Sequence, residues 1–93
     1  IGPSYQFADA VVAAATFQPD VAVEFLPEIV QLIDRYAASL PDISLRLCDA
    51  LELLLEKEKE GEAYVLPLVQ TVKKVKDEEL RRRLEAIIKK YVK

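Results

Sequence analysis

Apolar residues recur at helical spacing through most of this 93-residue chain, and that spacing constrains its fold more than any other feature. Three segments carry apolar side chains at positions i, i+3, i+4 and i+7, the pattern of a helix with one buried face. The alternation expected of a half-buried strand does not occur. The sequence therefore predicts an all-α fold. The stripes are Leu47, Cys48, Leu51, Leu54, Leu55; Val65, Leu68, Val69, Val72, Val75; and Leu80, Leu84, Ile87, Ile88, Tyr91.

Proline followed by aspartate divides the first half of the chain into helices. Pro19-Asp20 and Pro41-Asp42 each place a residue that cannot continue a helix before an aspartate that can cap the next one. Pro27 falls inside the second helical stretch, where its missing N–H leaves a helical hydrogen bond unmade. We expect that stretch either to kink there or to divide into a short turn and a new helix.

Five helices are expected in all, in a single domain. Short connections between them predict antiparallel packing of successive helices. Ser4 is expected to cap the first helix, and Gly61 is expected to end the third in the left-handed conformation. The expected helices cover residues 4–17, 21–40, 42–59, 62 (or 67)–76 and 77–92.

The chain also contains an internal repeat. Leu26-Pro27 is echoed forty residues later by Leu66-Pro67, and Asp42 is echoed by Asp77. Each unit therefore reads as Leu-Pro, an apolar helix, a turn with aspartate, and a second amphipathic helix. That second helix holds an aliphatic-Arg pair in both units, Leu45-Arg46 and Leu80-Arg81.

This repeat resembles the helical hairpin of HEAT-like proteins over roughly residues 24–92. The resemblance implies two stacked hairpins, at residues 21–60 and 62–92, preceded by the second helix of an incomplete unit. It also implies a curved surface that holds a protein or a nucleic acid and seldom catalyses. A plain five-helix bundle is the alternative architecture. Because the chain begins at Ile1 and contains no methionine, we expect it to be either an excised or processed chain or the ordered part of a longer protein.

Composition excludes several kinds of active site. The chain has no histidine, one cysteine and two separated glycines. It therefore has no histidine base or metal ligand, no internal disulfide and no glycine-rich phosphate loop. We expect no enzyme activity, cofactor or metal, and interpret the chain as a scaffold domain that binds another protein. A single cysteine, with no signal peptide or apolar span, favours the cytoplasm and no membrane contact.

The first helix is apolar on almost every side. Between Tyr5 and Phe17 only Gln6, Asp9 and Thr16 are not apolar. Such a helix is either the central helix of the bundle or an association surface covered by an upstream repeat or by a second copy of the chain. Self-association is the expected outcome in the second case. The candidate association residues are Tyr5, Phe7, Val11 and Val12.

Charge is divided unevenly along the chain. Residues 1–62 carry twelve acidic and four basic side chains, whereas residues 63–93 carry four acidic and nine basic ones. The basic stretch is a candidate surface for a nucleic acid or an acidic protein, and nucleic-acid binding is the alternative function. The competing interpretation is a solvated surface neutralised by acid-before-base pairs four residues apart. The candidate residues are Arg82, Arg83, Lys89, Lys90, Lys93, Lys73 and Lys74.

Overall fold

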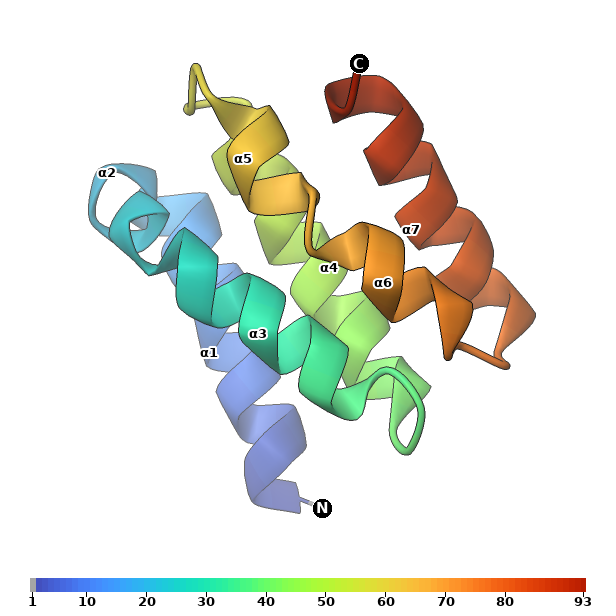
Figure 1. Ribbon diagram of the computed structural model, residues 1–93. Helices are drawn as coiled ribbons and strands as arrows, with labels where there is room; N and C mark the ends of the chain where they lie inside the picture. The colour runs from blue at the N-terminus through green and yellow to red at the C-terminus, as the bar shows by residue number, and fades with distance from the viewer. Residues whose placement is uncertain (1) are drawn as a thin grey trace.

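The computed structural model describes the backbone of residues 2–93 and the side chains from Tyr5 onward, and that part of the chain contains helices and loops only. The predicted all-α fold is confirmed (Figure 1). In chain order the elements are α1 (Gly2–Phe17), α2 (Pro19–Ala22), the 3-10 helix η1 (Val23–Phe25), α3 (Leu26–Tyr36), α4 (Pro41–Leu55), α5 (Gly61–Val65), α6 (Leu68–Lys73) and α7 (Glu78–Tyr91).

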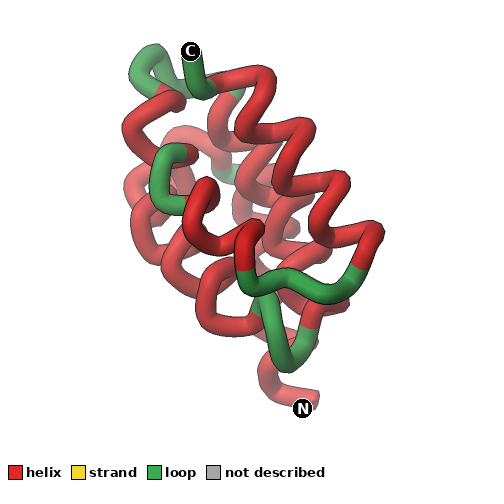
Figure 2. The backbone as a smooth tube through the Cα atoms, turned by 45° about the vertical axis from the view of Figure 1, so that its right-hand side comes forward, coloured by secondary structure: helices red, strands yellow, loops and turns green. Residues whose placement is uncertain are grey.

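Helix α4 lies at the centre of the molecule. It contacts α1 on one side and α7 on the other, and α3 packs across it (Figure 1). Helices α5 and α6 continue the layer of α3 and contact α7. The resulting arrangement is two helices thick and measures 37 × 33 × 17 Å along its principal axes (Figure 2). The interpretation of the first helix as the central one is therefore wrong, because α4 takes that position.

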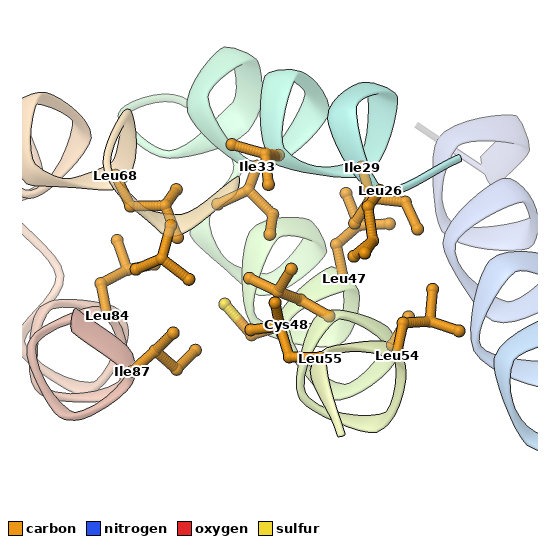
Figure 3. Close-up of a cluster of buried hydrophobic side chains, with 14 of the residues drawn as sticks. Leu26, Ile29, Ile33, Leu47, Cys48, Leu54, Leu55, Leu68, Leu84 and Ile87 are labelled. Atoms are coloured by element: carbon orange, nitrogen blue, oxygen red, sulfur yellow. The ribbon is translucent and has the colours of Figure 1, made fainter. Parts of the chain in front are cut away.

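The apolar stripes predicted from the sequence form the core. All five stripe residues of α4 are buried, and leucine and isoleucine side chains from α3, α6 and α7 meet them (Figure 3). Each fully buried leucine contributes roughly 1.5–3 kcal/mol relative to an exposed one. Leu51 and Leu84 are fully buried as expected, whereas Val72 and Ile88 are only partly buried at the edge of the core.

Proline, rather than aspartate, begins two of the helices. Pro19 and Pro41 occupy the first turn of α2 and α4, and neither helix has a side-chain cap. Proline suits this position because its fixed backbone angle is helical and its missing N–H would have had no partner there. The expected caps at Asp20 and Asp42 are therefore wrong. Both aspartates lie in the first turn, where their charge favours the helix dipole.

Asp77 is a true helix cap. Its carboxylate accepts a hydrogen bond of 3.3 Å from the backbone N–H of Leu80 at the start of α7. Helix α1 begins at Gly2, and the expected cap at Ser4 lies outside the side chains that the structure describes.

The second predicted helix is divided near Pro27 into a short segment and a new helix, which was one of the two expected outcomes. Helix α2 passes into η1, and α3 then begins with Pro27 in its first turn. The echoed proline acts in the same way, because α5 ends at Val65 and α6 begins at Leu68, on either side of Pro67.

Helix α4 ends at Leu55, four residues before its expected end. The residues that follow are all charged, so a longer helix would bury no further apolar surface. Gly61 is not in the left-handed conformation and instead begins α5. A Cβ atom there would lie 3.1 Å from Cδ1 of Tyr91 and 3.3 Å from Cδ2 of Leu55, so glycine allows α7 to approach closely.

A buried serine joins α3 to α4. The Ser44 hydroxyl donates a 2.7 Å hydrogen bond to the backbone carbonyl of Ile33. In a continuing helix the N–H of Ala37 would donate to that carbonyl, but here it donates to the backbone carbonyl of Asp34. Ser44 therefore satisfies a carbonyl that the end of α3 leaves unpaired.

The Leu84→Ala variant should lose about 2–5 kcal/mol of unfolding free energy, because it leaves a cavity where α7 meets the core. Chemical denaturation measures this loss. Leu53→Ala is the matched control, since Leu53 is 40 % exposed on α4, and it should lose clearly less. A loss under about 0.5 kcal/mol for Leu84→Ala would contradict the placement of α7.

Candidate functional site

An apolar groove of about 280 Å³ opens between α1, the α2–η1 segment and α3. Helix α1 contributes Phe7, Ala10, Val11 and Ala14, and Gln18 follows directly after that helix. The α2–η1 segment contributes Val21, Ala22 and Phe25. Helix α3 contributes Glu28, Ile29 and Leu32.

The groove lies beside the core-facing side of α1. This helix packs its small residues Ala8 and Ala15 into the core, and the groove opens along the adjacent side of the helix. Phe7 and Phe25 stand on the two walls and are 51 % and 55 % exposed. Neighbouring large apolar side chains that are this exposed are more typical of a surface that binds another molecule than of one that faces only water.

Two of the four residues expected to form the association surface line the groove. They are Phe7 and Val11, and Val11 is also partly buried against the hydrophobic core. The other two, Tyr5 and Val12, pack against the core without lining the groove. A helix that is apolar all round gives no sign of which side its neighbour takes, so the sequence could not separate these pairs.

The opposite wall of the groove was missed from the sequence. Phe25, Ile29 and Leu32 recur at positions i, i+4 and i+7, so the signal of an amphipathic face was present. No face was predicted for this segment from the sequence, and its central residue Ile29 is buried in the core.

The groove lies in an acidic part of the chain. Residues 1–34 contain no lysine or arginine. Asp20, Glu24 and Glu28 are exposed beside or within the groove and make no ion pair with any described residue. Asp9 forms an ion pair with Arg46 of α4, which ties α1 to the centre of the molecule.

The predicted basic surface is interrupted at Arg83. Its guanidinium forms 2.6 Å hydrogen bonds with Asp49 and with Glu52, so it joins α7 to α4 instead of facing a partner. Burial opposes the charge of Arg83, but these two carboxylates outweigh it and raise the pKa of Arg83. The predicted surface residue Arg83 is therefore only partly exposed and is paired with α4.

Other members of the basic stretch also have partners in the chain. Lys74 lies 3.0 Å from Asp34, Arg82 lies 3.8 Å from Glu78, and the Lys90 ammonium lies 5.4 Å from the ring centre of Tyr91. The predicted residues that make no ion pair within residues 5–93 are Lys73, Lys89, Lys90 and Lys93. Among the described residues, only the pair of Arg82 with Glu78 is one of the expected acid-before-base pairs four residues apart, whereas Lys74 and Arg83 pair with other helices.

A second, more polar groove lies between α3 and the α5–α6 segment, with Pro27 and Pro67 among its lining residues. The buried Thr71 hydroxyl donates a 2.7 Å hydrogen bond to the Asp34 carboxylate. This bond, opposed by burial and assisted by Lys74, lowers the pKa of Asp34. Asp34 therefore links α3 to α6 by accepting this hydrogen bond.

The described residues offer little chemistry for a reaction. Cys48 is buried among leucines, and this burial raises the pKa of its thiol to about 12. No cluster of three metal-ligating side chains occurs among the residues whose positions are described. Within the same part of the chain, no helix has both the length and the apolar character needed to cross a membrane.

Comparison of the chain with models of protein families, with curated proteins and with solved structures finds no match. The site is therefore interpreted from its geometry.

The Thr71→Val variant should raise the pKa of Asp34, because it removes the strongest of the interactions that lower it. Because the pKa of Asp34 is lowered in the folded state, its ionised carboxylate stabilises the fold at pH values above the ordinary pKa of 3.8. That contribution is lost as the pH falls through the lowered pKa. NMR titration of the Asp34 carboxyl measures the change. Lys74→Met should raise this pKa less, since Lys74 is exposed, and an unchanged titration in Thr71→Val would contradict the link.

Proposed function

We propose that this chain is a non-catalytic protein-interaction module, and that its partner binds the groove between α1, η1 and α3. The observation that carries the proposal is the exposure of Phe7 and Phe25 on facing walls of an otherwise apolar groove. The absence of histidine from the sequence and the burial of Cys48 support a role without catalysis. The unpaired cysteine supports a cytoplasmic location as part of the same proposal.

The HEAT-like architecture belongs to this proposal as well. Two helix pairs support it, since α3 contacts α4 and α6 contacts α7. The position of α1 beside α4, on the side away from α7, also supports it, because an array would place the second helix of a preceding unit there. In such an array the exposed Phe17, 81 % accessible at the end of α1, would lie toward the upstream unit.

A photo-crosslinking amino acid at position 7 should form covalent adducts with a partner protein in cells that express the chain. The same amino acid at Ala13 is the matched control, because Ala13 is exposed on α1 but does not line the groove. Mass spectrometry of the adducts identifies what is bound. Equal adducts at both positions, or none at position 7, would remove the groove as the binding surface.

Nucleic-acid binding is the second candidate function, favoured by the exposed Arg82, Lys89 and Lys90 on α7. Binding through phosphates would be independent of sequence and would weaken steeply with salt, because each neutralised phosphate releases counterions. The ion pairs of Arg83 and Lys74, and the net charge of −3, oppose it.

We expect weak or absent binding to duplex DNA at about 150 mM salt, with somewhat more at about 50 mM. A titration of labelled duplex at both salt concentrations measures it, with the double variant Arg82→Glu/Lys89→Glu as the control. Micromolar or tighter binding at the higher salt, abolished by the double variant, would reverse the order of the two functions.

A further inference from the structure

We infer that the occupant of the groove is an amphipathic α-helix of a partner protein, with lysine or arginine beside its apolar residues. This inference rests on the proposed function and specifies the chemistry of the partner. It follows from the shape of the groove and from the charges around it, which are independent observations.

The shape of the groove fits one face of a helix. Its first wall runs from Phe7 on α1 to Gln18 just after that helix, a separation of eleven positions, or about 16 Å at 1.5 Å per residue. That length matches about three turns of a bound helix. The small side chains Ala10 and Ala14 keep the α1 wall low, so that larger side chains of a partner can enter between Phe7 and Phe25. Recognition of this kind uses anchors at positions i, i+3 or i+4 and i+7.

The volume of the groove is less suited to a small molecule. Its 280 Å³ lies just below the range of about 300–1,000 Å³ found for pockets that enclose such ligands. Its lining offers only Gln18 and Glu28 as polar side chains, which is few for orienting a polar ligand. Apolar anchors of a helix need no such groups.

The charges around the groove specify the polar flank of the partner. Glu28 lines the groove, and Asp20 and Glu24 are exposed on the α2–η1 segment beside it. No lysine or arginine occurs before Arg35, so this part of the chain supplies no cation to neutralise them. A partner helix with basic residues beside its apolar anchors would place opposite charges against this rim, which favours encounter and fixes orientation.

A second copy of the chain fits the groove less well. In a two-fold contact the groove would face its own image, which sets Glu28 and its acidic neighbours against the same residues. Like charges placed across an interface oppose association. The basic helix α7 of another copy cannot supply the anchors either, because Leu80, Leu84 and Ile87 are buried in its own core.

Two synthetic peptides of about 14 residues, long enough for almost four helical turns, test the inference. Both carry leucine at positions i, i+3, i+4 and i+7; one has lysine at the flanking positions and the other has glutamate. We expect the lysine peptide to bind at about 150 mM salt with a Kd about tenfold lower than that of the glutamate peptide. NMR shifts of the protein locate the bound peptide, and circular dichroism reports its helix formation.

Matched variants connect the binding to the groove. Ala10→Arg places a long cationic side chain in the groove and should raise the Kd of the lysine peptide by about tenfold or more. Ala13→Arg adds the same side chain to α1 outside the groove and should leave the Kd unchanged. Glu28→Gln should weaken binding by about two- to fivefold, the range of an exposed ion pair, whereas Glu85→Gln, at an exposed position of α7 that does not line the groove, should not.

Three outcomes would overturn the inference. Equal binding of both peptides in the groove would remove the basic flank while leaving the proposed function in place. Absence of binding by either peptide would remove the helical occupant, and the crosslinks at position 7 would then decide the proposed function separately. Sedimentation showing a dimer that Ala10→Arg dissociates would identify a second copy as the occupant. If Ala10→Arg loses the native NMR spectrum, Phe7→Gln replaces it, because Phe7 is half exposed.

Discussion

The arrangement depends on one constraint, which is that α4 must be covered on three sides. Its buried residues are not confined to a single stripe, because Ile43, Ser44 and Ala50 are also buried. A helix apolar over so much of its circumference needs several neighbours. Helices α1, α3 and α7 supply that cover, and the ion pairs of Asp9 with Arg46 and of Arg83 with Glu52 hold the outer two in place. Each neighbouring helix uses one face to cover α4. The side of α1 that lines the groove is therefore left open.

Much of the fold could be predicted from the sequence because helical periodicity is local information. The stripes of α4 and α7 and the division at Pro27 all depend on residues within a turn or two of each other. The errors occurred where a choice between two local solutions depends on packing. Pro41 and Asp42 could each begin α4, and Gly61 could end one helix or begin another. The close approach of α7 explains the glycine, and no local pattern contains that contact.

The candidate site was less predictable because it depends on contacts between distant segments. A first helix that is apolar on almost every side does not indicate which side its neighbours cover, so Tyr5 and Phe7 could not be distinguished from the sequence. Arg83 has an acidic neighbour four residues before it, yet its carboxylate partners lie more than thirty residues away on α4. The uneven distribution of charge along the chain could be predicted from the sequence. Its relation to the groove could not, because that depends on the fold, which places the acidic first part of the chain beside the groove.

The buried thiol makes this core observable without any added probe. Only a thiolate reacts readily with alkylating reagents, and Cys48 has both a raised pKa and no access to solvent. Alkylation of Cys48 in the native chain therefore requires α4 to separate from its neighbours, and the rate of alkylation reports how often this local opening occurs. A cysteine introduced at the rim of the groove would react long before Cys48. A dye could thus be attached there while the native thiol continues to record how often the core comes apart.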